Sequence, residues 1–353
     1  MNADPQPPTQ NSWRAIWREL MGPRELAMLG ALGVMLLFIS FGPVHTSDGW
    51  VWGGARETFW SVTNQQSLGR QIALLGILAL GQTFVIIAGG FDLSVGAIVG
   101  ISGVMTAFLL TSDSTAGGLA GWGLPAWQAL PIVLMLAALI GCCNGLLVTK
   151  LGISPFVATL SMMLVLRGLA KIVTRAIAIP VQDPSVVSLA AIQGGQIPPI
   201  VILLAVTLLL SVLFLHFTTT GRYLYAIGSN EEATRLSGVN VQRVKILAYT
   251  MSGLVAGLVG ILHASYNYQG EPNAGRGYEL FAIASVVIGG AALTGGEGTA
   301  VGAIIGASIF QVVLNGLPKI IKVDSSIWED AIVGMVLLAA VVIASVRQMR
   351  RRR

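Results

Sequence analysis

Long apolar segments separated by short polar connections recur along nearly the whole chain. They are 26–44, 71–89, 93–110, 127–148, 154–174, 197–217, 246–265, 280–293, 298–317 and 327–346. Because a helix rises about 1.5 Å per residue, about 20 apolar residues cross a hydrocarbon core of about 30 Å. The pattern therefore predicts an all-α polytopic membrane protein with about ten transmembrane helices. The segment 280–293 is too short for a full crossing, which indicates a broken or re-entrant helix.

The two halves of the chain contain similar stretches. IIAGG (86–90) precedes VGAIVGIS (95–102), and VVIGG (286–290) precedes VGAIIGAS (301–308). In both, an apolar run ends at a glycine pair, and the next helix opens with Gly-x-x-x-Gly. Small residues four apart let helices approach closely in lipid. Chance similarity among helices rich in Gly, Ala, Ile and Val is the alternative. The parallel positions favour an internal repeat, and transporters often build their path from such interrupted segments.

Composition agrees with a membrane location, because 54% of the residues are hydrophobic and 10% are charged. Soluble domains carry about 25% charged residues. Most Lys and Arg fall in segments that are cytoplasmic if both termini are inside, so the net charge of +5 reflects topology rather than nucleic-acid binding. We expect a cytoplasmic N-terminal segment with an interfacial helix (1–25), one transmembrane domain (26–346) and a basic cytoplasmic tail (347–353).

One carboxylate interrupts the apolar pattern in AGGFDLSVG, where Asp92 is the only charged residue between Arg70 and Asp113. Gly89 and Gly90 can end a helix in the left-handed conformation. Asp92 or Ser94 can then cap the next helix, whose dipole favours the negative charge. Two interpretations stay open: a buried group beside a transport path, or a solvated cap in a tight cytoplasmic turn.

The longest inner connection covers 218–245. Ser229 and Glu232 have capping-box spacing, and Gly238 is a natural C-terminal cap, so a helix of about two turns is expected between them. A helix this short is marginal by itself in water. It either rests on the rest of the chain or serves as a docking element for a cytoplasmic partner.

Several kinds of chemistry are absent from the sequence. It contains no Gly-x-x-x-x-Gly-Lys-Ser/Thr phosphate loop, no His and Cys spacing typical of a metal site, and no nucleophile beside a His and an acid. The neighbouring Cys142 and Cys143 cannot easily bridge. We therefore expect no catalytic residue, no metal and no cofactor in this chain, which predicts that it is not an enzyme.

Four longer stretches carry a more specific pattern between about residues 65 and 345. They are GGFDLSVGAIVG, NGLLVTKLGISPFVATLSMMLVLRG, GRYLYAIGSNEEATRLSGVNVQRVK and ELFAIASVVIGGAALTGGEGTAVGAIIGASI. Together they resemble the permease subunit of bacterial carbohydrate ATP-binding-cassette importers, the ribose/xylose/arabinose/galactoside group. The resemblance implies a bacterial inner-membrane subunit that passes a monosaccharide by alternating access. Its implied partners are a separate ATPase that hydrolyses ATP, a periplasmic sugar-binding protein and a second permease chain, identical or similar.

The resemblance also implies roles for individual residues. The substrate path would include Asp92, Ser94, Asn144, Ser154 and Pro155. Coupling to the ATPase would use Glu231, Glu232, Ala233 and Gly238. The chain departs from the pattern at Phe281, which replaces the usual acid, and at GGAA (289–292), which replaces Gly-Gly-Thr-Ser. A heteromeric partner could supply the two lost polar groups.

Two alternatives remain at this point. In an ion-coupled secondary transporter, Asp92 would bind a proton or a sodium ion and no ATPase would be needed. The permeases for branched-chain amino acids have a similar architecture, although the string GGFDLSVG favours the sugar group.

Overall fold

The computed structural model describes residues 22–46, 49–52, 55–112, 121–191 and 197–320, with helical positions 331, 334, 335, 338 and 342. Among these residues, seven helices are long and apolar enough to cross a membrane. They are α2 (Pro23–Phe41), α4 (Val62–Ile87), α6 (Ala126–Thr149), α7 (Pro155–Thr174), α9 (Pro199–Phe217), α12 (Val241–Asn267) and α14 (Ala300–Ile320). The predicted all-α polytopic fold is confirmed.

Two further apolar helices are short, α5 (Val95–Leu110) and α13 (Tyr278–Ile288), with 16 and 11 residues. At about 1.5 Å per residue they reach roughly 24 and 16 Å, less than a full hydrocarbon core. The sequence predicted the shortness of α13 but not that of α5. Of the predicted tenth span (327–346), only helical positions 331, 334, 335, 338 and 342 are described. Most of the N-terminal segment (1–25) and the tail (347–353) lie outside the described residues.

The remaining elements are small. They are α3 (Arg56–Phe59), α8 (Pro184–Val187), α10 (Thr219–Ser229), α11 (Glu231–Leu236), β1 (Pro43–Thr46), β2 (Gly49–Trp52), β3 (Ile179–Pro180) and β4 (Gln269–Gly270). Strand β1 pairs antiparallel with β2, and β3 pairs antiparallel with β4. The second pair ties the chain after α7 to the chain after α12. The sequence analysis anticipated neither pair.

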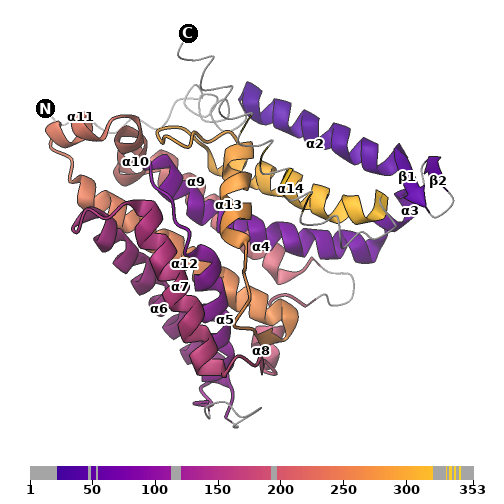
Figure 1. The fold of residues 1–353 in the computed structure, drawn as a ribbon, viewed down its shortest axis with the longest axis horizontal. Coiled ribbons are helices and arrows are strands. Elements are labelled where there is room, and N and C mark those ends of the chain that lie inside the picture. The colour runs from indigo at the N-terminus through magenta and orange to yellow at the C-terminus, as the bar shows by residue number, and fades with distance from the viewer. Residues whose placement is uncertain are drawn as a thin grey trace, which may run out of the picture.

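Figure 1 shows two groups of helices that diverge from a common region near α13. The group of α2, α4 and α14 extends to the right, and the group of α5, α6, α7 and α12 extends downward. Helix α12 packs against α4, α5 and α6, while α4 also packs against α9, α13 and α14. In the most apolar part of each helix, 83% of the residues are buried in α4, but only 22% are buried in α2, in α7 and in α9. Helices α4 and α12 therefore form the core, and the others offer apolar faces to lipid.

Glycines set the closest helix contacts. Gly141 and Gly253 face each other where α6 crosses α12, and a Cβ on Gly253 would lie 2.4 Å from the Ala137 carbonyl oxygen. Both belong to Gly-x-x-x-Gly pairs, with Gly145 and Gly257. Such pairs let two backbones approach directly. Both pairs are visible in the sequence, which does not show that they face each other.

The repeated Gly-x-x-x-Gly pairs do different things in the two halves. On α14, Gly302 and Gly306 face the backbone of α13, and a Cβ on Gly306 would lie 1.9 Å from the Ser285 carbonyl oxygen. On α5, Gly96 and Gly100 instead admit the non-helical segment 272–275 and the first turn of α13. The motif therefore gives helix-to-helix packing in the second half, and space for a loop in the first.

Candidate functional site

The chain between α4 and α5 begins with a tight helix end. Gly89 has φ +76°, its N–H donates to the Ile86 carbonyl oxygen at 2.9 Å, and the Gly90 N–H donates to the Val85 carbonyl oxygen at 2.9 Å. This is a Schellman end, which favours glycine at the left-handed position. The expectation for Gly89 is confirmed, whereas Gly90 has no positive φ.

Helix α13 ends in the same kind of turn, but there the left-handed residue is the second glycine of the pair rather than the first. There the left-handed residue is Gly290, with φ +90°, and its N–H donates to the Val287 carbonyl oxygen at 3.0 Å. The Ala291 N–H donates to the Val286 carbonyl oxygen at 3.1 Å. Both repeated apolar runs therefore end in the same backbone turn, after which one chain leads into α5 and the other into α14.

Asp92 follows the first turn and lies at the centre of a buried polar cluster. Its Oδ1 accepts from the Ser94 hydroxyl at 2.6 Å and from the Ser94 N–H at 3.0 Å. Its Oδ2 accepts from the Ser252 hydroxyl of α12 at 3.1 Å. The Asn144 amide of α6 donates to the Ser94 hydroxyl at 2.8 Å and lies 3.5 Å from Asp92 Oδ1. All four residues are fully buried.

The backbone around Asp92 is held from further helices. The Gln82 amide of α4 donates to the Asp92 carbonyl oxygen, and the Leu93 N–H donates to the Thr159 hydroxyl of α7 at 3.1 Å. The Tyr249 hydroxyl of α12 donates to the Phe91 carbonyl oxygen at 3.2 Å. The cluster thus connects the α4–α5 junction to α4, α6, α7 and α12.

This geometry excludes one of the two interpretations of Asp92. A solvated cap is wrong, because the side chain has 0% exposure. It does not cap α5 either, since it accepts from the N–H of Ser94, the residue before the helix, and Ser94 makes no side-chain cap bond. Asp92 forms no ion pair with any described residue. Its carboxyl group instead joins hydroxyl and amide donors from separate helices.

The other two predicted path residues, Ser154 and Pro155, lie at the start of α7. Pro155 is the first residue of α7, and its carbonyl oxygen accepts from the Thr159 hydroxyl at 2.7 Å. Ser154 precedes α7, is exposed, and makes no side-chain cap bond. The structure therefore brings Asp92, Ser94 and Asn144 together and leaves Ser154 apart. Ser252, Thr159 and Gln82 were not predicted as site residues, and their signal in the sequence is a single polar residue on an apolar helix.

The predicted coupling segment protrudes from the end of the molecule at the upper left of Figure 1, where α10 leads into α11. Glu231, Glu232 and Ala233 are exposed, and Leu236 has 79% exposure. Lys245 donates to Glu231 Oε2 at 2.6 Å, and Arg235 pairs with Glu232. The segment is thus a short helix with its acidic and apolar side chains turned outward.

The ends of α11 differ in part from the sequence prediction. Asn230, not Ser229, is the N-terminal cap, because its side chain accepts from the Ala233 N–H at 2.9 Å. Ser229 instead ends α10, where its hydroxyl donates to the Tyr225 carbonyl oxygen at 2.8 Å. Gly238 is the predicted C-terminal cap, with φ +86°. The capping-box interpretation is wrong by one residue because α10 was not foreseen.

Gly228, in the last turn of α10, touches both repeated junctions. A Cβ on Gly228 would lie 1.9 Å from the Ile87 carbonyl oxygen and 2.2 Å from the Gly296 nitrogen. The Gly296 N–H itself donates to the Ile87 carbonyl oxygen at 2.9 Å. The end of α4, the segment before α14 and the helix before α11 therefore meet without side chains between them. We call this contact of Ile87, Gly228 and Gly296 the glycine joint.

Within the described residues, no group of three or more His, Cys, Asp or Glu side chains could hold a metal ion. Cys142 and Cys143 are free thiols.

Comparison with known proteins gives close matches. The ribose import permease protein of Escherichia coli is 37% identical over 294 residues, 82% of this chain and 88% of that protein. The L-arabinose transport system permease protein of Escherichia coli is 34% identical over 295 residues, 83% of this chain and 86% of that protein. A probable ABC transporter permease protein of Sinorhizobium fredii is 38% identical over 330 residues, 93% of this chain and 91% of that protein.

No solved structure matches the chain. The family described as the branched-chain amino acid transport system / permease component matches residues 66–341, which include the polar cluster, α11 and both repeated junctions. The chain is therefore a member of this family of membrane permease components.

Proposed function

We propose that the chain is the membrane subunit of an ATP-driven importer that carries a monosaccharide such as a pentose across the bacterial inner membrane. The observation that carries this proposal is the match, over more than four fifths of the chain, to permeases named for ribose and arabinose import. In this role the chain provides the path and performs no chemistry of its own. It carries no phosphate loop, so ATP hydrolysis belongs to a partner subunit.

The proposed partners follow from the exposed surfaces and from the family. An ATPase subunit would dock on α11, whose outward Glu231, Glu232 and Leu236 offer charged and apolar contacts. A sugar-binding protein would deliver the sugar at the opposite end, and a second permease chain would complete the path. In this proposal α11 lies on the cytoplasmic side, and we infer the same side for both termini.

The proposed mechanism is alternating access, driven through the glycine joint. Movement of the ATPase would pull α11 and α10, and Gly228 would pass that displacement to the end of α4 and the segment before α14. Packed elements with few intervening side chains deform little and shift between discrete arrangements. The Asp92 cluster would keep the α4–α5 junction attached to α6, α7 and α12 during that movement.

The family description names branched-chain amino acids, so an amino acid permease is the second candidate. Radiolabelled D-ribose, L-arabinose and L-leucine, offered to cells that express the chain with its partner subunits, distinguish the two. We expect uptake of a sugar that stops when ATP is depleted. Uptake of leucine alone would support the second candidate. Uptake that follows a proton or sodium gradient and ignores ATP would support the ion-coupled carrier.

A further inference from the structure

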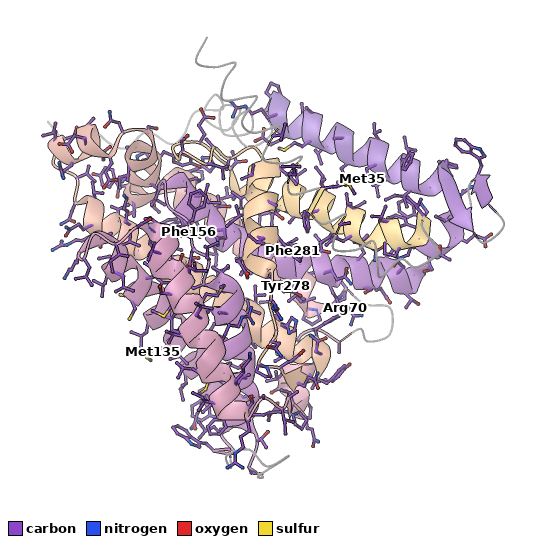
Figure 2. All side chains as sticks on the ribbon, viewed as in Figure 1. Met35, Arg70, Met135, Phe156, Tyr278 and Phe281 are labelled. Atoms are coloured by element: carbon purple, nitrogen blue, oxygen red, sulfur yellow. The ribbon has the colours of Figure 1, made fainter. Side chains whose placement is uncertain are left out.

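A cavity of about 410 Å³ lies where α4, α12, α13 and α14 meet. It is bordered by the first half of α4, the last turns of α12, the first turns of α13 and the last turns of α14. The other ends of α4, α12 and α14 lie near α10 and α11. The cavity therefore lies toward the end opposite α11, in the space between the two helix groups where Figure 2 labels Tyr278 and Phe281.

One side of the cavity is a series of aromatic rings. The Phe281 ring lies 5.0 Å from the Phe310 ring and 6.2 Å from the Tyr278 ring, measured between centroids, and the His263 ring lies 5.9 Å from Tyr278. Tyr278, Phe281 and His263 line the cavity directly, with Tyr266 beside them. An aromatic face carries negative potential and attracts C–H groups polarised by neighbouring oxygens. A sugar presents such C–H groups on the faces of its ring.

The other sides offer amides. Gln71, Asn267, Gln311 and Asn315 come from three different helices. Asn315 is engaged with Asn64 at 3.0 Å and 3.1 Å, whereas Gln311 makes no side-chain hydrogen bond to any described residue. An amide both donates and accepts, as a sugar hydroxyl does. Gln311 is therefore an uncharged hydrogen-bonding group that is available to a ligand.

The charge of the lining suits a neutral ligand better than an amino acid. Among the described residues that border the cavity there is no carboxylate to pair with an ammonium group. Lys319 is the one Lys or Arg among them, and its ammonium group already donates to the Asn315 carbonyl oxygen at 3.0 Å and to its side-chain oxygen at 3.2 Å. An unpaired charge in such a site is costly. The volume falls within the range of about 300–1,000 Å³ that is typical of small-molecule sites.

The geometry points to a binding site for one neutral monosaccharide in this cavity, with Phe281 and Tyr278 as its stacking surface and Gln311 as its free hydrogen-bonding group. This inference rests on the proposed function and adds where this chain contacts the sugar. It also gives a purpose to Phe281. The aromatic ring stands where the family resemblance implies an acid, and in this chain it provides an apolar surface for stacking.

The test measures protection of a cysteine. Gln311→Cys is introduced where Cys142 and Cys143 are replaced by Ala, and the permease is purified in lipid nanodiscs with its co-purifying subunits. Its reaction rate with a small maleimide is measured with D-ribose, L-arabinose or L-leucine. We expect one sugar to slow the reaction about tenfold at about ten times its Kd, because only the unoccupied fraction reacts. Glu57→Cys, on exposed α3, is the matched control and should react equally in all conditions.

A second reporter, Leu314→Cys, lies in the same lining and covers the case in which Gln311→Cys does not fold. If the native complex takes up D-ribose or L-arabinose in vesicles but neither sugar protects either cysteine, the cavity is not the site, and the proposed function stands. If L-leucine protects and the sugars do not, both the inference and the proposed function are overturned. Replacing Phe281 with Ala removes the stacking ring and should weaken protection by the sugar.

Discussion

The replacement of Gly228 by Ala tests whether the glycine joint transmits movement from α11. A Cβ at this position would lie 1.9 Å from the Ile87 carbonyl oxygen, whereas ordinary van der Waals contact begins at 3.4 Å. The end of α10 must therefore separate from α4 by about 1.5 Å, the difference between these two distances. The 2.9 Å hydrogen bond from Gly296 to Ile87 lies in the same contact and would be strained or lost.

The free energy of this change can be approximated. Overpacking costs about 1–3 kcal/mol, and a lost backbone hydrogen bond adds about 1 kcal/mol. We therefore expect Gly228→Ala to lower the free energy of unfolding by about 2–4 kcal/mol. The outward side chains of α11 do not touch Gly228, so binding of the ATPase should be retained. Transport should fall about tenfold or more, which corresponds to about 1.4 kcal/mol or more in the barrier.

The assay compares ATP-driven sugar uptake with the amount of ATPase that co-purifies and with the melting temperature in detergent. Gly168→Ala in α7 is the matched control, because a Cβ there meets nothing within 4 Å and the residue has no positive φ. This variant should keep native transport and gain about 0.5–1 kcal/mol of helix stability. Native transport and an unchanged melting temperature in Gly228→Ala would refute the joint, since α10 and α4 would then separate without cost.

Three further changes test other parts of the account. Asp92→Ala leaves the Ser94 N–H and the hydroxyls of Ser94 and Ser252 without their acceptor, and at about 1–3 kcal/mol per group this predicts a large loss of stability. Asp92→Asn keeps one acceptor oxygen and should lose less stability. Equal melting temperatures for the two variants would contradict the role of the cluster. Asn230→Ala removes the cap of α11 and should cost about 0.5–2 kcal/mol locally, seen as faster amide exchange in α11. Gly253→Ala should push α12 from α6, because its Cβ would lie 2.4 Å from the Ala137 carbonyl oxygen, and an unchanged melting temperature would refute that crossing.

Much of the fold could be predicted because the membrane imposes one strong rule. In a helical membrane protein every span is an apolar helix, so long apolar runs mark the spans, and glycine pairs mark where they break. Gly89 and Gly238 behave as predicted because their left-handed conformation is a local property of the backbone. The sequence does not predict that the left-handed residue is the first glycine of one pair, Gly89, and the second of the other, Gly290, since each turn packs against different neighbours.

The site was harder to predict, for a physical reason. Asp92 stood out because it is charged, but its partners Ser252 and Asn144 are single polar residues on helices far apart in the sequence. Hydropathy shows that such residues exist and not which ones meet. The glycine joint is harder still, because Gly228, Ile87 and Gly296 share no pattern and only their backbones touch. Helix α10 was missed because its apolar face is short and lies inside a polar loop.

The most direct test of the account is purification of the tagged chain from its native membranes, comparing the native sequence with a variant carrying Glu232→Arg and Gly238→Pro. Proline fixes φ near −65° and therefore cannot adopt the left-handed φ of +86° that Gly238 has. The arginine reverses an exposed charge on α11. We predict that a subunit with a phosphate loop and ATPase activity co-purifies with the native chain and is lost from the variant. If no such subunit accompanies the native chain, or if the variant retains it in full, α11 is not the coupling site and the importer account is contradicted.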